Sequence, residues 1–308
     1  MPEKVIIICD PGIDGAFAVA LALHDPDLDV IALAASAGNV PAEQATQNVH
    51  ILVEQIDPPR WPRLGAALAV EYEVDGTRLH GAKGLGNTSF PCAQLHHPHP
   101  SDKLVVDLVK QNPKEVAVVC LGPLTVLARA LDREPELPGL IKRLVCVGGA
   151  WHETGNAGPV SEFHFFCDPL AARQVVHAGM NLTLIPLDVS RKILFAPTDL
   201  SSLPDLPSRT GQFLRHILPF GIAATANLYG IEGFHLKDVL GIVGVAHPEA
   251  LRTRSVAVDV ELRGELTRGM SVVDQRPWRT ATPNVHLAME VDAQAARAYM
   301  DRVLQRAG

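Results

Sequence analysis

The stretch KVIIICDPGIDGAFAVALAL, residues 4–23, joins an apolar run to a helical pattern through a tight turn rich in Gly and Pro. The run at residues 4–9 is almost continuously apolar, which is typical of a strand buried on both faces of a parallel sheet. Residues 15–25 carry apolar side chains at helical spacing. Because a strand followed directly by a helix is the repeating unit of α/β proteins, this stretch predicts that class of fold.

The same alternation continues along the first two thirds of the chain. Further buried strands are predicted at residues 28–36, 115–121, 143–149 and 181–188, and helices at residues 42–56 and 169–179. This order predicts a doubly wound, mostly parallel sheet that is flanked by helices on both faces.

The last third is less regular. It predicts a loop at residues 201–211, helical patterns at 211–230 and 235–249, an antiparallel strand pair at 254–262 and 269–276, and a closing helix at 292–308. No internal repeat or long linker interrupts the chain, so a single domain over residues 1–308 is expected.

Composition narrows the class of protein. The chain has 308 residues, 47% of them hydrophobic, and a net charge of −7, which argues against a nucleic-acid partner. No apolar run approaches the roughly 20 residues that a membrane span needs, so no membrane partner is expected. The N-terminus begins a strand rather than a signal peptide. The five cysteines are scattered without C-x-x-C spacing, which indicates reduced thiols and a cytoplasmic protein.

Unusual polar residues follow several of the predicted strands. Asp10 and Asp14 come after the first strand, Asn39 after the second, and the turns at residues 121–125 and 148–156 after the next two. Ligands of such sheets bind beyond the carboxyl ends of the strands. We therefore expect these segments to converge on one crevice.

The turn DPGID at residues 10–14 is the first candidate site. Two acids in a sharp turn can face one cavity, and carboxylates are the ligands that Ca²⁺ and Mg²⁺ prefer. In the alternative interpretation, Asp14 caps the following helix and Asp10 is a solvated turn residue. The turn alone leaves both interpretations open.

A second candidate group lies in the segment at residues 155–169, where Asn156, Glu162 and His164 stand close together in the sequence. A mixture of amide, acid and imidazole suits recognition of hydroxyl groups, as in a sugar. Asp168, before a proline, is expected only to start a helix.

A third group comprises His235, Lys237 and Asp238, which lead into a predicted helix. A polar helix start explains these residues as well as a functional site does, so both interpretations remain open.

Two loop motifs carry weaker signals. The histidines of HHPHP at residues 96–100 could bind a transition metal, although histidines in such a loop are usually solvated. The segment HGAKGLGN at residues 80–87 is glycine-rich but lacks the spacing of a phosphate-binding loop. A lid over the crevice is the better interpretation, with His80 as a candidate substrate contact.

Taken in order, these segments resemble the nucleoside hydrolases, the inosine–uridine-preferring N-ribohydrolase family. The resemblance covers essentially the whole chain and is carried by DPGIDGAFAVALAL, AGNV, LGPLT, VGGA followed by GN, SEFHFFCDPLAA, FHLKD and GELTRGMSVVD. It implies a Rossmann-like fold and hydrolysis of a ribonucleoside to ribose and free base. It also implies a tightly held Ca²⁺ and a homodimer or homotetramer.

The resemblance also implies roles for single residues. Asp10 would be a metal ligand and the general base, and Asn39 would orient the metal-bound water. Asp238 and the main-chain carbonyl of Leu121 would be further metal ligands. Asp14, Asn156 and Glu162 would grip the ribose hydroxyl groups. Beside these implied contacts, His164 and His80 are candidate substrate-binding residues, and Lys237 would either assist the leaving base or select a substrate with an anionic group.

Four positions depart from the family pattern. Ile8 and Gly15 stand where the family has acids, and the acid at position 15 normally binds the metal. His164 replaces a common sugar-binding Asn, and Lys237 replaces the His of many purine-active members. Two functions therefore remain open: a working N-glycoside hydrolase, or a nucleoside- or ADP-ribose-type sensor that keeps ribose recognition without turnover.

The nucleobase is not identified by the sequence. Its recognition is expected to come from residues 76–90 and 215–235, which would lie over the crevice. Trp151 and Tyr229 are candidates for stacking on a base, although either aromatic side chain could equally serve packing.

Overall fold

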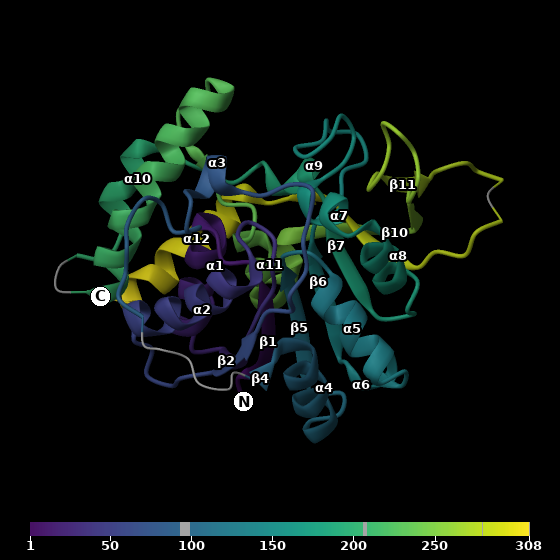
Figure 1. Cartoon of the computed structure of the whole chain (residues 1–308), viewed down its shortest axis with the longest axis horizontal. Coiled ribbons are helices and arrows are strands. Elements are labelled where there is room, and N and C mark those ends of the chain that lie inside the picture. Colours follow the sequence, from purple (N-terminus) through teal and green to yellow (C-terminus); the bar gives the residue numbers. More distant parts are fainter. Residues whose placement is uncertain (93–98, 206–207, 279, 308) are drawn as a thin grey trace.

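The computed structural model describes residues 1–92, 99–205, 208–278 and 280–307. Its main feature is one large sheet in the strand order β11-β10-β12-β7-β6-β5-β1-β2-β3-β4 (Figure 1). All neighbours from β12 to β4 are parallel, and only β10 and β11 run antiparallel to their neighbours. The prediction of a mostly parallel α/β sheet is therefore confirmed.

The strands of this sheet are β1 (Glu3–Cys9), β2 (Leu28–Ala35), β3 (Arg63–Ala66), β4 (His99–Pro100), β5 (Val116–Leu121), β6 (Arg143–Val147), β7 (Leu182–Ile185), β10 (Leu251–Val260), β11 (Ser271–Asp274) and β12 (Val285–Val291). A small antiparallel pair is formed by β8 (Leu194–Phe195) and β9 (Phe234–His235).

The helices are α1 (Ile13–His24), α2 (Ala42–Ile56), α3 (Thr77–His80), α4 (Ser101–Gln111), α5 (Thr125–Arg133), α6 (Leu137–Leu140), α7 (Phe163–Cys167), α8 (Pro169–Val176), α9 (Leu187–Ser190), α10 (Arg209–Tyr229), α11 (Val239–Ala246) and α12 (Ala293–Leu304), together with short 3₁₀ turns at Pro197–Ser202, Pro248–Ala250 and Gln305–Ala307. Within the described part of the chain, no helix combines the length and the apolar character that crossing a membrane requires.

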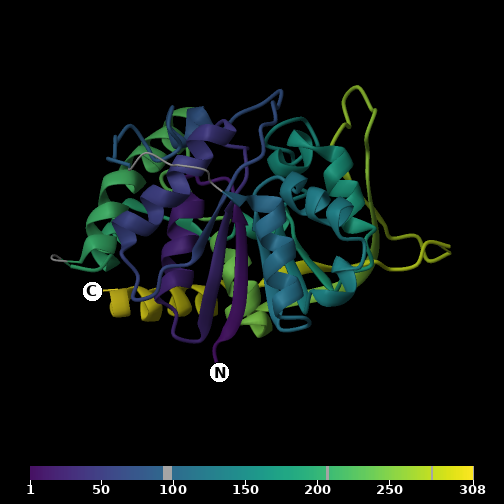
Figure 2. The ribbon, with the colours of Figure 1, turned by 60° about the horizontal axis from the view of Figure 1, so that its bottom comes forward.

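Helices cover both faces of the sheet, and each face has its own apolar core (Figures 1 and 2). Val5, Ile7 and Cys9 of β1 pack into the core beneath α1, α2, α10, α11 and α12. Ile6 and Ile8 of the same strand pack into the core beneath α4, α5 and α8. Because side chains alternate between faces along a strand, a continuous apolar run is what a doubly covered strand requires.

The position of the site follows from the order of the strands. From β1 the chain builds outward through β2, β3 and β4, and it then returns to place β5 on the other side of β1. The connections that follow β1 and β5 leave in opposite directions, which opens a crevice at the carboxyl ends of these two strands. Asp10 directly follows β1, and Leu121 ends β5 beside Cys9 in the parallel register.

Several predicted boundaries are wrong. The strand predicted at residues 181–188 ends at Ile185, because Pro186 interrupts it and a helical turn begins at Leu187. The helical pattern at 235–249 becomes a helix only from Val239, since His235 belongs to β9. The loop predicted at 201–211 is shorter, because α10 begins at Arg209 with Ser208 as its cap.

Other elements were not foreseen. Helices α4 and α5 cover one face of the sheet, and strand β12 joins the antiparallel edge to β7. Of the HHPHP motif, residues 96–98 lie outside the described residues, and His99 lies 3.4 Å from Asp107.

A buried hydrogen bond fastens the last helix to the first. The Tyr299 hydroxyl donates to Asp25 at 2.8 Å, and the tyrosine is 2% exposed. We expect Tyr299→Phe to lower the free energy of unfolding by about 1–3 kcal/mol, because the Asp25 carboxylate loses a buried donor. Urea denaturation followed by circular dichroism measures this, with Trp61→Phe at an exposed position as the control. Equal midpoints for the Tyr299→Phe variant and the wild type would contradict this expectation.

Candidate active site

Asp10 is the buried centre of the site. The main-chain amide of Asn39 donates to Asp10 Oδ2 at 2.9 Å, and the Asn39 side chain donates to the Asp10 carbonyl at 2.9 Å. Gly38 permits this approach, because a Cβ there would lie 2.0 Å from Asp10 Oδ2. The other oxygen, Oδ1, is buried without a hydrogen-bond partner among the described residues. One carboxylate oxygen is thus held by a hydrogen bond, whereas the hydrogen-bonding capacity of the other is unused among the described residues.

Two further carboxylates, Asp14 and Asp238, are buried near Asp10. Burial, opposed by His164 and aided by the charge of Asp14, raises the pKa of Asp10 to about 7. Burial, followed by the charges of Asp14 and Asp10, raises the pKa of Asp238 well above its usual range. Like charges that have been removed from water disfavour ionisation, so this cluster favours a cation or a proton.

Asp14 does not cap the helix. Helix α1 begins at Ile13 with Gly12 at the cap position, and Asp14 lies in the first helical turn. Its carboxylate accepts a hydrogen bond from the Gly15 amide at 3.1 Å. The capping interpretation of this residue is therefore wrong, and the side chain lines the cavity instead.

Glu162 and His164 form a linked pair at the wall of the cavity, where His164 lines the cavity and Glu162 lies behind it. Glu162 Oε2 accepts from the amides of Gly149, His164 and Phe165, so this carboxylate caps helix α7. His164 Nδ1 lies 2.9 Å from the carbonyl of Val147, and Nε2 lies 3.7 Å from Asp10 Oδ1. Burial acts to lower the pKa of His164, but the carboxylates of Glu162 and Asp10 outweigh it and raise that pKa.

His80 is held as a neutral ring. Its Nδ1 accepts a hydrogen bond from the Ile13 amide at 3.0 Å, and burial lowers its pKa to about 4. Because Nδ1 is the acceptor, Nε2 carries the ring proton and is available as a donor to a ligand in the cavity that His80 lines.

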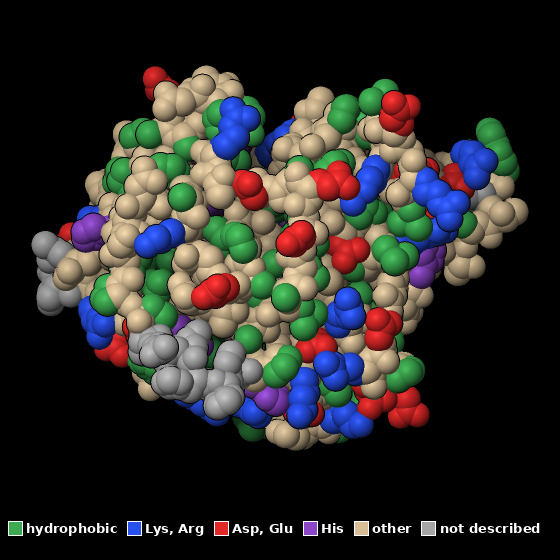
Figure 3. Space-filling view, viewed as in Figure 1, with side chains coloured by type: hydrophobic (Ala, Val, Ile, Leu, Met, Phe, Trp, Pro, Cys, Tyr) green, Lys and Arg blue, Asp and Glu red, His purple; other side chains and the backbone are tan. Residues whose placement is uncertain are grey.

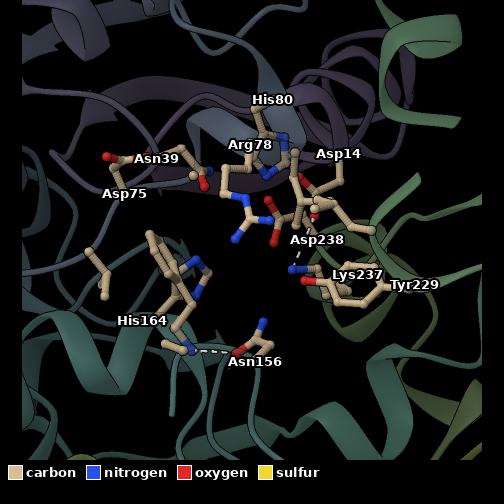
Figure 4. Close-up of a pocket in the computed structure, with 16 residues that line it drawn as sticks. Asp14, Asn39, Asp75, Arg78, His80, Asn156, His164, Tyr229, Lys237 and Asp238 are labelled. Atoms are coloured by element: carbon tan, nitrogen blue, oxygen red, sulfur yellow. Dashed lines mark hydrogen bonds and ion pairs between the residues drawn. The ribbon is translucent and has the colours of Figure 1, made fainter. Parts of the chain in front are cut away.

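Lys237 supplies a positive charge on the wall of the cavity that lies opposite His164 (Figure 4). Its Nζ lies 4.0 Å from Asp14 Oδ2. Burial acts to lower the pKa of Lys237, but the carboxylates of Asp14 and Asp238 raise it, so the ammonium remains charged.

Most of these side chains line a hollow beside α3 and α10, on the face shown in Figure 3. It has a polar chamber of about 340 Å³, lined by Asp14, Asn39, Asp75, Arg78, His80, Asn156, His164, Lys237 and Asp238, among others. A more apolar chamber of about 290 Å³ adjoins it, lined by Leu79, Thr225, Ile231, Phe234, Arg191 and His235, among others. Tyr229 lines both chambers, and Trp151 lines neither among the residues that the structure describes.

The structure thus brings seven of the predicted site residues to one polar chamber: Asp14, Asn39, His80, Asn156, His164, Lys237 and Asp238. Asp10 and Glu162 lie behind the wall and contact it through His164.

Two arginines of the cavity, Arg78 and Arg191, were not foreseen. Arg78 lies in the predicted lid segment two residues before His80, which is the one sequence signal that could have indicated it.

The donor set for a metal is reduced but suitable. Among the described residues, no group of three or more His, Cys, Asp or Glu side chains is arranged to hold a metal ion. Asp10 Oδ1 and Asp238 nevertheless offer buried carboxylate oxygens, which are the ligands that hard cations prefer. A Cβ at Gly15 would lie 3.1 Å from Asp238 Oδ2, so the missing acid at this position would have entered the same cluster.

Fold and site together define a class of α/β enzyme whose acid-lined pocket, at the switch point of a parallel sheet, suits a polyhydroxylated ligand. Residues 5–298 match the family described as inosine-uridine preferring nucleoside hydrolase. The chain belongs to this family. Its members are ribonucleoside hydrolases that cleave N-glycosidic bonds and are generally metal-dependent, which favours an enzyme over a ribose-binding sensor.

Similar proteins support this assignment over the whole chain. An inosine-uridine preferring nucleoside hydrolase of Leishmania major is 33% identical, and the match covers 100% of this chain and 99% of that protein. A pyrimidine-specific ribonucleoside hydrolase of Klebsiella pneumoniae is 32% identical, over 99% and 98% of the two chains. The structure of a purine-preferring ribonucleoside hydrolase from Gardnerella vaginalis has a TM-score of 0.91 at 26% identity, over 99% of each chain.

The neutral state of His80 can be tested by NMR of the ring nitrogens. With its pKa lowered to about 4, His80 should remain neutral and protonated on Nε2 in the folded protein at pH 5.5. An unfolded histidine titrates near 6.5, so His80 favours folding fully above that pH and progressively less as the pH falls towards 4. His80→Gln identifies the signal by its loss. A charged His80 ring at pH 5.5 would refute the assignment.

Proposed function

We propose that this chain hydrolyses the N-glycosidic bond of a ribonucleoside to ribose and free base, with Asp10 as the general base. The observation that carries this proposal is the Asp10 carboxylate behind the polar chamber, which has one oxygen fixed by Asn39 and the other without a hydrogen-bond partner among the described residues. Membership of a family of ribonucleoside hydrolases supports the reaction type.

Asp10 has the properties that the first step needs. A pKa raised to about 7 lies near neutral pH, where a carboxylate can both be ionised and accept a proton from an attacking water. As the bond to the base weakens, positive charge grows on the sugar. The carboxylates of Asp14 and Asp238 stabilise this oxocarbenium-like state.

The departing base leaves with a pair of electrons and must be neutralised. Lys237 offers an ammonium, and His80 offers its Nε2 proton, from residues that line both chambers. A fixed positive charge stabilises the negative charge that develops on the base during cleavage.

Ribose would be held in the polar chamber. Asn156 Oδ1 accepts from the Phe163 amide at 2.8 Å. The NH2 group of the same side chain has no acceptor among the described residues and can donate to a ligand. Asp14 offers acceptor oxygens to hydroxyl groups. Glu162 has one oxygen occupied by the cap of α7, so only Oε1 remains for a sugar contact. We assign His164 to the same wall, beside Asp10.

We propose Ca²⁺ as the metal, held by Asp10, Asp238 and the carbonyl of Leu121. When bound, such a cation lowers the pKa of a bound water and offsets the negative charge of the carboxylates. Asn39 would orient that water. Gly15 leaves the metal with one carboxylate fewer than the family pattern provides, so weaker binding is expected.

We further propose that the protein acts in purine or pyrimidine salvage in the cytoplasm, as a homodimer or homotetramer. Its partners would be small nucleosides rather than nucleic acid or membranes, in keeping with its net charge of −7. The preferred nucleobase is a separate question, because the similar proteins include both pyrimidine-specific and purine-preferring enzymes.

The role of Asp10 is tested by base release from a panel of ribonucleosides, on protein whose bound calcium is counted by elemental analysis. Asp10→Asn should lower kcat by at least about 100-fold, because an amide cannot take the proton of the attacking water. Asp29→Asn, at a surface ion pair with Arg60, is the matched control. Turnover retained by Asp10→Asn would remove Asp10 as the base. No base release by the wild type, with ribose still raising its melting temperature, would indicate a receptor.

The cost of the missing acid is tested at Gly15. We expect Gly15→Asp to tighten Ca²⁺ binding by about 10- to 100-fold, because it adds a carboxylate beside Asp238. Gly15→Ala adds the same Cβ without the charge and should not tighten binding. Calorimetric titration with Ca²⁺ measures both variants. If Gly15→Asp left affinity and activity unchanged or lowered them, the site would have been rebuilt around glycine.

A further inference from the structure

Arg78 is an arginine without a counter-charge at the polar chamber. It extends from α3 into the chamber, and it has no hydrogen-bond or ion-pair partner among the described residues (Figure 4). Arg191, the other arginine of the cavity, is different, because it pairs with Glu153 at 3.0 Å. A guanidinium left unpaired over a binding cavity is available to an anion of the ligand.

The position of Arg78 indicates which end of the ligand it would contact. Arg78 lines the polar chamber, together with Asp14 and Asp238, but not the apolar chamber. The apolar chamber contains Phe234 and Ile231 and has the character of a nucleobase site. Arg78 therefore lies at the sugar end of the cavity.

Neighbouring groups favour the same ligand chemistry. The NH2 group of the Asn156 side chain has no acceptor among the described residues. In the same part of the chain, Asp14 is the one ion-pair partner of Lys237 Nζ, at 4.0 Å. These donors face the same chamber as Arg78 (Figure 4). The buried carboxylates Asp14 and Asp238 suit hydroxyl groups of the ribose ring and would repel an anion placed there. A negatively charged group would thus extend from the one remaining position of the sugar, its 5′ carbon.

We propose that the substrate is a ribonucleoside 5′-monophosphate and that Arg78 binds its phosphate. This inference rests on the proposed function and specifies its substrate. Water attacks C1′, the C1′–N bond breaks, and the base leaves with the bonding electrons and takes the Nε2 proton of His80. The proton of the water passes to Asp10. The phosphate ester stays intact, so the products are ribose 5-phosphate and free base.

The first test compares kcat/KM for uridine and inosine with that for their 5′-monophosphates, on the whole protein with Ca²⁺ present. We expect the wild type to prefer the monophosphates. Arg78→Gln should lower the ratio of charged to neutral substrate by about 10- to 100-fold, because a charge-assisted hydrogen bond is lost. Arg78→Lys should restore part of the ratio. Arg129→Gln removes the same charge from an exposed position on α5 outside both chambers, and should leave the ratio unchanged.

A binding measurement separates failure of this inference from failure of the proposed function. Calorimetry with D-ribose and D-ribose 5-phosphate needs no turnover, and the phosphate should bind at least about tenfold more tightly in the wild type but not in Arg78→Gln. That result without any base release would uphold the phosphate site and overturn the hydrolase. Cleavage of neutral nucleosides with a ratio that Arg78→Gln does not change would overturn the phosphate site alone. A preference for xanthosine over inosine that depends on Arg78 would also overturn it, in favour of an acidic base.

Discussion

Burial of like charge at the switch point of the sheet is the constraint on which the rest of the site depends. Asp10, Asp14 and Asp238 are each at most 3% exposed, and they come from two segments more than 200 residues apart in the chain. A cluster of this kind is unfavourable unless cations, protons or hydrogen bonds compensate it. The turn after β1, the Asn39 amide, His164 and Lys237 supply part of that compensation.

The departures from the family pattern at Gly15, His164 and Lys237 all make the site less negative. Gly15 removes a negative charge beside Asp238, while His164 and Lys237, whose pKa values are raised, lie near Asp10 and Asp14. Each change reduces the electrostatic demand for a bound divalent cation. Asp10 Oδ1 still lacks a hydrogen-bond partner within the part of the chain that the structure describes, so the compensation there is incomplete.

Site residues also hold the fold together, so chemistry and structure are coupled. His80 accepts from the Ile13 amide at the start of α1, and Glu162 caps α7 through two amides of that helix while also accepting from the Gly149 amide. Free amides at helix starts need such partners. The number of sugar contacts is reduced, because a carboxylate oxygen that caps a helix cannot also accept from a sugar hydroxyl. This double use explains why Glu162 is buried behind the chamber wall rather than at its surface.

The sequence by itself determined the parallel α/β class, because runs such as residues 4–9 are apolar on both faces, and it determined the polar residues at the strand ends. Seven of the residues that it singled out line the polar chamber. Only the tertiary structure decided that Asp14 lines a cavity rather than capping α1 and that Trp151 lies outside both chambers. It also decided that Arg78, at the sugar end, has no ion-pair partner among the residues described. Periodicity reports which face of an element is buried, whereas these outcomes depend on which side chains distant segments bring together.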